Sequence, residues 1–499
     1  MASNKVVDFI IIGAGLAGIC AFVEIQQAYP QATIKVFEKS HEIGGTWSKN
    51  VYPNLSCDIP SQLYSFSFAL NPDWSTTYAT QGEILAYIQR VAREFGVYDH
   101  TNFRQECVSA VWLDDRWLWQ LKFKDPDTQK ICTQECRFLI TATGFCDTPV
   151  GVNDIESSEK FLGAIFHTSG WDQSYSFQGK NVLVMGNGSS ANQVIPWLLT
   201  KGQVNSLLQV VRSEHWIAPK IDTPIGTTQR WVLHNVPFAN RAWRLLTALK
   251  LDLLFSLFKK GRVGDLLRKP VQSSIQDYME RTAPRKYHSI LIPDFPIGAK
   301  RIVMDHGYLK SLNDPRVSLL KSRDLRAVGP KTLEIDHETR FEADTIILAN
   351  GFKTQELLTP VAIHGLQGAI LPGIWHQAGN WAAAVMVPNF PNMSILTGPN
   401  TLPSGHSTLV EIECTVRYIS RLLQPLLAPT QTQSTKCKIQ VKQNAYDEYN
   451  KWVQTELSGL VYTPKVGNWY IDRKTGKNTL IWPGSQFRFW WSMCITPIK

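Results

Sequence analysis

The stretch that decides the fold lies near the amino end, where residues 6–18 read VVDFIIIGAGLAG. The apolar run that precedes the glycines is typical of a buried strand in a parallel sheet. Gly13, Gly15 and Gly18 follow it without a gap, and an amphipathic helical pattern then continues through Tyr29. Strand, glycine turn and helix in this order predict a site where backbone N–H groups at a helix N-terminus hold a pyrophosphate.

An acidic residue completes this first unit. A second strand is predicted over residues 33–37 and ends at Glu38, about twenty residues past the last glycine. A carboxylate at that point accepts hydrogen bonds from ribose hydroxyls. We therefore expect a Rossmann-like unit that binds an adenine dinucleotide with a free ribose.

A second copy of the pattern begins at residue 181, where the chain reads NVLVMGNGSSA. A helix is predicted from there to Leu199 and a strand over residues 207–211, and Arg212 and Ser213 stand where the first unit has its acid. A guanidinium pairs with a 2′-phosphate that a carboxylate would repel, so this unit is expected to bind NADPH. Its predicted cofactor-binding residues are Gly186, Asn187, Gly188, Ser189, Ser190, Ala191, Arg212 and Ser213.

Two further strands are expected to end beside these glycine turns. Residues 138–143 lead into Ala142-Thr143-Gly144, and residues 344–352 contain the similar Ala349-Asn350-Gly351. Each small-residue turn would bring the backbone back to one of the two nucleotide sites.

Two dinucleotide units in one chain indicate hydride transfer from NADPH to a flavin. A disulfide reductase would need a cysteine pair beside the flavin, but the nine cysteines are scattered and contain no C-x-x-C spacing. Oxygen is then the expected electron acceptor. The same cysteine pattern predicts neither a zinc knuckle nor disulfides, and it favours a reduced, intracellular protein, for which we expect the cytoplasm.

Composition agrees with a globular enzyme of two or three domains: 499 residues, 44% hydrophobic, with a net charge of +9. The basic residues are spread along the chain, so nucleic acid is not an expected partner.

No apolar run reaches the ~18 residues of a membrane-spanning helix. Residues 241–262 carry leucines at helical spacing between basic ends. Such a helix can lie on a membrane surface or pack inside the protein, and the packed helix is expected. Core or capping positions are expected for Phe487, Phe489, Trp490 and Trp491.

Between the two units, residues 161–172 read FLGAIFHTSGWD. This matches the F-x-G-x-x-x-H-x-x-x-W-[PD] fingerprint, so the chain resembles type I Baeyer–Villiger monooxygenases. Residues 44–47 (GGTW), Tyr52, Asp58 and residues 293–301 (PDFPIGAKR) resemble other signatures of that family. Asn54 departs from the family pattern, which usually has glycine or methionine there.

The resemblance implies an α/β fold with two Rossmann-like domains and a helical insert. It places the FAD domain at residues 1–147 and 366–499, the NADPH domain at 148–220 and 298–365, and the helical insert at 221–297. Within the fingerprint, His167 is expected to hold the link between domains and to take no part in acid–base chemistry.

The resemblance also implies the chemistry. In such enzymes reduced flavin and O₂ form a C4a-peroxyflavin, whose anion attacks a ketone to give an ester or lactone. Arg301 would stabilise the anion with Asp58 as its partner, and Lys300 would reach the 2′-phosphate beside Arg212. Further flavin contacts are implied for Gly45, Thr46, Trp47, Cys57, Asp58, Ile59, Tyr64 and Val108. Two alternatives are an N- or S-oxygenating monooxygenase of the same fold and a non-catalytic protein that senses dinucleotides.

Overall fold

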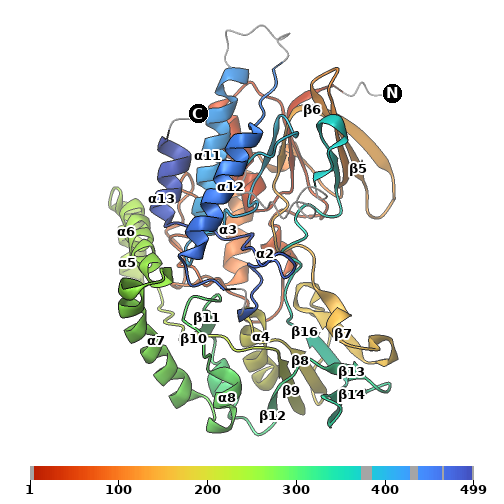
Figure 1. Cartoon of the computed structure of the whole chain (residues 1–499), viewed down its shortest axis with the longest axis vertical. Helices are drawn as coiled ribbons and strands as arrows, with labels where there is room; N and C mark the ends of the chain where they lie inside the picture. Colours follow the sequence, from red (N-terminus) through yellow and green to blue (C-terminus); the bar gives the residue numbers. More distant parts are fainter. Residues whose placement is uncertain (1–4, 372–384, 428–436, 464–465, 497–499) are drawn as a thin grey trace.

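The computed structural model of the chain describes residues 5–371, 385–427, 437–463 and 466–496. It has an upper lobe that contains both chain ends and a lower lobe formed by the middle of the chain (Figure 1). Each lobe is built around its own β-sheet with parallel strands at its centre. The predicted α/β class with two Rossmann-like units is confirmed.

The upper sheet has eight strands in the order β17-β4-β5-β6-β1-β2-β3, with β18 also paired to β6. Strand β1 (Val7–Ile12) pairs in parallel with β2 (Ile34–Phe37) and with β6 (Ile131–Thr141), and α1 (Leu16–Ala28) connects β1 to β2. These are the elements predicted around the first glycine turn. The other strands are β3 (Thr101–Asn102), β4 (Glu106–Leu113), β5 (Leu118–Lys124), β17 (Ala362–His364) and β18 (Met393–Ile395).

The lower sheet has five parallel strands in the order β12-β9-β8-β16-β7. Its strands are β7 (Ala164–His167), β8 (Asn181–Met185), β9 (Ser206–Val211), β12 (Val317–Lys321) and β16 (Thr345–Leu348), with helix α4 (Ser189–Thr200) between β8 and β9. A three-stranded antiparallel sheet, β13 (Leu325–Ala327), β14 (Thr332–Ile335) and β15 (Thr339–Glu342), and the pair β10 (Ile217–Pro219) and β11 (Val303–Asp305) complete this part of the chain.

The chain returns to the upper sheet near residue 362, close to the end of the segment expected to form the NADPH domain. Strand β17 pairs in parallel with β4 in the upper sheet, and Ile363 packs in the upper core.

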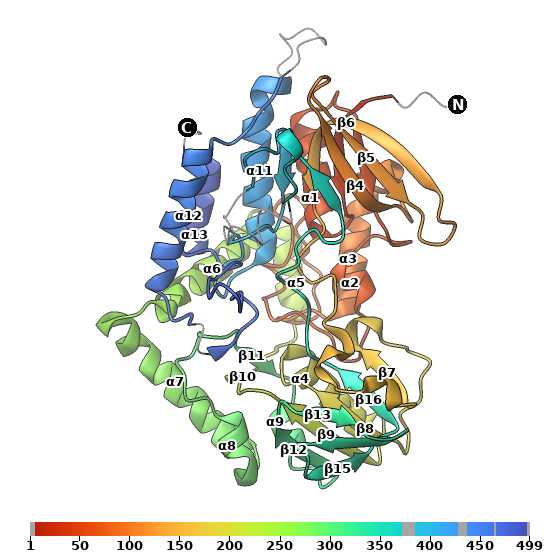
Figure 2. The same ribbon diagram turned by 45° about the vertical axis from the view of Figure 1, so that its right-hand side comes forward.

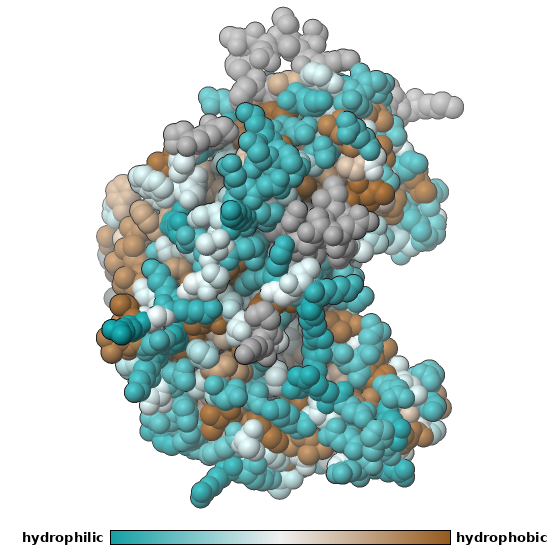
Figure 3. All heavy atoms as spheres, viewed as in Figure 1, coloured by the Kyte–Doolittle hydropathy of each residue, from teal (hydrophilic) through white to brown (hydrophobic). Residues whose placement is uncertain are grey.

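Helices α5 (Thr227–Asn235), α6 (Ala239–Leu253), α7 (Arg262–Thr282) and α8 (His288–Leu291) run along one side of both lobes (Figure 2). The expectation that residues 241–262 pack inside the protein is wrong. Ala248 and Leu251 contact the upper core, whereas Leu245 and Leu253 on the opposite face of α6 are 60% and 77% exposed. Apolar side chains gather on the surface over α5 and α6 (Figure 3).

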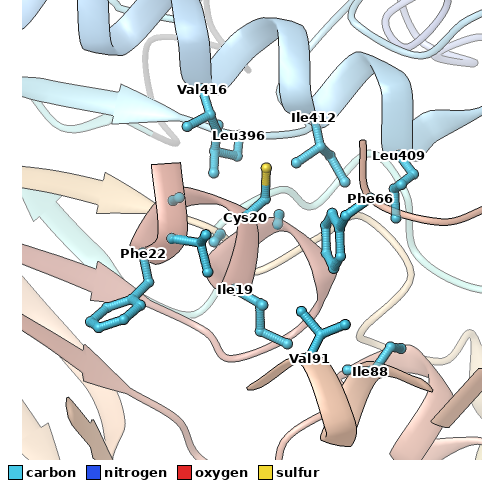
Figure 4. Close-up of a cluster of buried hydrophobic side chains, with 14 of the residues drawn as sticks. Ile19, Cys20, Phe22, Phe66, Ile88, Val91, Leu396, Leu409, Ile412 and Val416 are labelled. Carbon is cyan, nitrogen blue, oxygen red and sulfur yellow. The ribbon is translucent and has the colours of Figure 1, made fainter. Parts of the chain in front are cut away.

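The two ends of the chain meet in the core of the upper lobe. Ile19 and Phe22 of α1 pack with Ile412 and Val416 of α11 (Thr408–Leu427) and with Val91 of α3 (Gln81–Glu94) (Figure 4). Helices α12 (Gln443–Ser458) and α13 (Gln486–Trp490) lie beside α11 (Figure 1). Of the tail aromatics, Phe489 is buried in the core, whereas Phe487 and Trp491 are exposed.

Candidate functional site

The first glycine turn packs backbone against backbone. Gly13 has φ +103°, and a Cβ added there would lie 2.6 Å from the carbonyl oxygen of Ala142, at the end of β6. A Cβ on Gly18 would lie 1.9 Å from the carbonyl oxygen of Gly13. Gly15 faces Gly45, whose Cα would be 3.5 Å from an added Cβ. No Cβ fits at Gly13 or Gly18, whereas at Gly15 the contact would be an ordinary van der Waals one. The turn leaves the backbone at the N-terminus of α1 open to a pyrophosphate.

Glu38 is fixed beside this turn. One of its carboxylate oxygens accepts a hydrogen bond from the backbone N–H of Ala14 at 2.7 Å, and the other accepts one from Ser40 at 2.8 Å. The residue is only 5% exposed, so its remaining lone pairs face a confined space next to the glycines. This placement fits a ribose whose hydroxyls donate to the carboxylate.

The predicted flavin-contact residues after Gly45 form a connected group. Thr46 and Trp47 begin the short helix α2 (Thr46–Lys49), and the Trp47 indole N–H donates to the Tyr64 hydroxyl at 3.0 Å. Burial raises the pKa of Tyr64, so this hydroxyl stays neutral. The aromatic pair therefore forms a rigid wall beside the first turn.

Cys57, Asp58 and Ile59, three more residues predicted to contact the flavin, lie in or near this wall. Cys57 and Ile59 are buried on either side of Asp58, and the Ile59 N–H points at the Cys57 sulfur. Burial raises the pKa of the Cys57 thiol to about 12, which keeps it protonated. Val108 lies elsewhere in the upper lobe, in strand β4, where the pairing with β5 shifts register.

The second glycine turn repeats the first in the lower lobe. Gly186 has φ +113°, and an added Cβ would lie 2.4 Å from the carbonyl oxygen of Ala349. The side-chain amide of Asn187 donates to the backbone carbonyl of Ser213 at 2.8 Å, which ties the turn to the end of β9. Ser189, Ser190 and the buried Ala191 form the first turn of α4, and open space surrounds Gly188.

A cluster of positive charges lies beside the second turn. The Lys300 ammonium donates to the Ser213 hydroxyl at 2.7 Å and to the Glu214 carbonyl at 3.1 Å. The pKa of Lys300 is lowered to about 8, chiefly by burial; the Glu214 charge opposes this change and the nearby Arg212 adds to it. Arg212 is 44% exposed and lies 3.4 Å from the Asp154 carboxylate, a contact long enough to yield to a stronger anion. The three predicted residues are thus brought together.

Sequence reasoning missed two members of this cluster. Lys321 and Arg323 also lower the pKa of Lys300 by charge repulsion. Lys321 is the last residue of β12 and Arg323 follows it, and β12 neighbours β9 in the sheet, so their position at the carboxyl end of a strand was a usable signal. Lys321 also pairs with Glu214. Four cations near Ser213 fit a phosphate monoester such as the 2′-phosphate of NADPH.

Arg301 and Asp58 form a two-point ion pair across the lobes. The Arg301 Nε lies 3.0 Å from one carboxylate oxygen of Asp58, and Nη2 lies 2.6 Å from the other. The Asp58 charge raises the pKa of the guanidinium, so Arg301 keeps its charge at every working pH. The Arg301 side chain is still 45% exposed, which leaves part of the guanidinium available to another anion.

Residues near the carboxyl end fix this arginine from another side. The Tyr470 hydroxyl accepts a hydrogen bond from Arg301, and the Asn468 side chain donates to the Ala299 carbonyl at 2.9 Å. Burial raises the pKa of Tyr470 to about 12. The contacts of Asn468 and Tyr470 with the Arg301 segment span about 170 residues, so no local signal in the sequence marks them.

The segment that carries Asp58 is fastened to the helix of the second turn. Gln193 of α4 accepts from the Tyr52 hydroxyl at 3.0 Å and donates to the Ser56 carbonyl at 3.1 Å. Asn54, the residue that departs from the family pattern, has φ +60° and donates to the Gln193 carbonyl at 3.3 Å. Asparagine tolerates this left-handed conformation, so the departure preserves the turn. Asp58 and Arg301 therefore lie between the two glycine turns.

The fingerprint residues themselves stay in the lower lobe. His167 bonds through Nε2 to the Gly351 carbonyl at 3.1 Å and accepts at Nδ1 from the Ser169 N–H. Trp171 is buried and stacks on Phe177 with ring centroids 5.2 Å apart. These contacts agree with a role for His167 in joining chain segments and give Trp171 a packing role.

The chain is similar in sequence and fold to known flavin-dependent monooxygenases. A family model described as an NAD(P)-binding Rossmann-like domain matches residues 11–80. A Baeyer–Villiger monooxygenase of Streptomyces coelicolor is 30% identical over 486 residues, which cover 96% of this chain and 89% of that protein. The FAD-binding monooxygenase ktnD of Aspergillus niger is 29% identical, over 96% of this chain and 79% of that protein. A steroid monooxygenase structure bound to NADP superposes with a TM-score of 0.83 at 24% identity, covering 98% and 97% of the two chains.

Proposed function

Since this chain belongs to the family of Baeyer–Villiger, FAD-binding monooxygenases, we propose that it inserts one oxygen atom of O₂ next to a ketone carbonyl at the expense of NADPH. Membership of this family, predicted from the sequence, is confirmed, and the chain is a flavin-dependent monooxygenase. The observation that carries the finer proposal is the Arg301–Asp58 pair between the two glycine turns.

Arg301 would hold negative charge in the reaction. FAD, when bound and reduced, supplies the chemistry that activates O₂. The fixed guanidinium would keep the activated oxygen anionic and therefore nucleophilic, and it would then stabilise the charge on the carbonyl oxygen after attack. Asp58 would position the guanidinium through two hydrogen bonds. The Tyr470 hydroxyl, which accepts another hydrogen bond from Arg301, would hold the side chain from a second direction.

The two dinucleotides would occupy the two turns. We assign FAD to the upper lobe, with Glu38 on its ribose, its pyrophosphate at Gly13, Gly15 and Gly18, and the wall from Gly45 to Tyr64 beside its ring. NADPH is assigned to the turn of residues 186–191, with its 2′-phosphate on Arg212, Ser213 and Lys300. The tight backbone packing and the cation cluster described above support these assignments.

The domain assignment follows from these sites. The FAD domain would comprise the upper sheet with both chain ends, and the NADPH domain the five-stranded sheet, with residues 221–297 as a helical insert. All nine cysteines are unpaired, which supports work in a reducing, intracellular compartment. In the described part of the chain, no helix is both long and apolar enough to cross a membrane.

Product analysis tests the proposal. The purified protein is incubated with NADPH, air and a panel of cyclic, linear and polycyclic ketones, with a thioether and a tertiary amine in parallel. Esters or lactones are expected from at least one ketone. Oxygenation of the thioether or amine alone would support the heteroatom-oxidising alternative. A yellow protein that bleaches with NADPH and regains its colour in air would exclude a dinucleotide sensor without turnover.

A further inference from the structure

The helical insert presents an apolar surface to solvent. We call it the insert face and define it as the exposed side of residues 227–267 together with Phe487 and Trp491. Its most exposed members are Trp231 at 61%, Phe238 at 74%, Leu245 at 60%, Leu253 at 77%, Val263 at 73% and Leu266 at 74%. Burial of such side chains is favourable, so their exposure in one region marks an interaction surface.

These side chains form one surface. The short turn Leu254–Phe258 joins α6 to the start of α7, and brown apolar atoms run continuously over α5 and α6 in Figure 3. The Asp252 carboxylate accepts from the backbone N–H groups of Gln486 at 2.6 Å and Phe487 at 3.2 Å. This contact sets Phe487 beside the end of α6.

The insert face is also strongly basic. Residues 227–267 contain seven lysines and arginines and two acidic residues, Asp252 and Asp265, a local charge of 7 − 2 = +5, and Asp265 pairs with Arg268 outside this range. Arg244 points inward to Glu413 at 2.9 Å, and the Asp252 carboxylate caps α13. Among the side chains that the structure describes, no carboxylate pairs with Arg241, Lys250, Lys259, Lys260 or Arg262.

Basic residues are interspersed among apolar ones along the amphipathic helix α6, and aromatic rings lie at both ends of the insert face. This combination matches the interface of a bilayer that contains anionic lipids, where leucines enter the acyl region and cations contact the phosphates. We propose that the insert face lies on the surface of an anionic lipid membrane and holds the enzyme there as a peripheral protein.

A second copy of the chain fits the insert face less well. A two-fold dimer brings the same patch of both subunits together. It would bring the basic patch of one subunit, which includes Lys250, Lys259 and Lys260, against the same basic patch of the other, and like charges oppose each other. The unpaired charges therefore favour a negatively charged occupant.

Vesicle sedimentation with matched variants tests the proposal. The purified flavin-containing protein is spun with vesicles of phosphatidylcholine, alone or mixed with phosphatidylglycerol. The wild type should pellet with the mixed vesicles, and added salt should weaken binding. Leu253→Glu should reduce the apparent affinity about tenfold or more. Leu162→Glu is the control, because Leu162 is also 77% exposed but lies in the lower lobe.

Further variants and outcomes keep the test decisive. Lys259→Glu combined with Lys260→Glu should abolish the preference for phosphatidylglycerol, and flavin content should stay unchanged because both side chains are exposed. Absence of vesicle binding, or equal losses for Leu253→Glu and Leu162→Glu, would overturn the proposal. So would a wild-type dimer, seen by analytical ultracentrifugation, that Leu253→Glu converts to monomer without any vesicle binding. The assay needs no turnover, so its result is independent of the proposed reaction.

Discussion

The two glycine turns share a backbone and differ in the side chains around it. In both, the first glycine has a positive φ, +103° at Gly13 and +113° at Gly186, and approaches the carbonyl of a neighbouring strand end. The third small residue is Gly18 in one and Ala191 in the other. The strand after the helix is followed by Glu38 in the upper lobe and by Arg212 in the lower lobe. We therefore propose that one backbone serves two nucleotides and that the charge after the second strand distinguishes them.

The two turns also differ in how closely the helix approaches the strand where they cross. A Cβ on Gly18 would overlap the Gly13 carbonyl at 1.9 Å, whereas the second turn already contains the methyl group of Ala191, fully buried. The first turn is closed more tightly. We expect the preference for one nucleotide over the other to come from the charged position after the second strand. Whether the third small residue can carry a methyl group depends on how closely the helix approaches the strand.

The largest expected effect concerns Arg301, which belongs to neither turn. Arg301→Ala should lower ester formation by about 10³-fold, because it removes a fixed charge from the site of oxygen transfer. Flavin reduction by NADPH, followed by stopped-flow absorbance, should change little. Arg340→Ala, which removes an arginine paired with Glu334 in the lower lobe, is the control. Ester formed at a near wild-type rate would remove Arg301 from the mechanism.

The tightness of the first turn is tested by Gly18→Ala. The added methyl group should cost about 3 kcal/mol of stability and weaken FAD binding, because the overlap is with backbone that has no room to shift. The reverse change in the second turn, Ala191→Gly, should cost only about 1 kcal/mol through helix propensity. Thermal unfolding and flavin content measure both. Equal losses in the two variants would mean that the turns are equally tight.

The charge difference is tested by Arg212→Ala. The KM for NADPH should rise about tenfold or more, because a hydrogen bond between charged groups is lost. The KM for NADH should stay within about twofold, since NADH lacks the 2′-phosphate. Steady-state kinetics with both coenzymes provide the measurement. Equal increases for both would show that Arg212 does not read the phosphate.

The smallest expected effect is a pH dependence from Lys300. Its pKa is lowered to about 8 in the free enzyme, so the side chain is charged below that pH and neutral above it. The ratio of kcat/KM for NADPH to kcat/KM for NADH should therefore fall about two- to fivefold between pH 7 and pH 9. Lys300→Arg keeps its charge and should give a flat ratio. A wild-type ratio that is also flat would place the titration of Lys300 outside this range.

The glycine turns and their strands were predictable because their signals are local. A run of apolar residues, three small residues and one charge specify strand, turn, helix and nucleotide within about forty residues. The ring of residues around Arg301 was less accessible. Tyr470 and Asn468 come from a segment far along the chain, and their contacts depend on how the carboxyl end folds back.

The sequence alone determined the two nucleotide units, the charge at each ribose and, through the resemblance, the family, because these depend on the identity and spacing of near neighbours. Only the tertiary structure decided which face of α6 is covered, where β17 joins its sheet and which side chains surround Lys300 and Arg301. An amphipathic helix has two faces, and the sequence shows only that they differ in polarity, not which segment of the protein covers either face. What lies against each face follows from packing between segments distant in the chain, and burial changes the energy of a charge as much as its neighbours do.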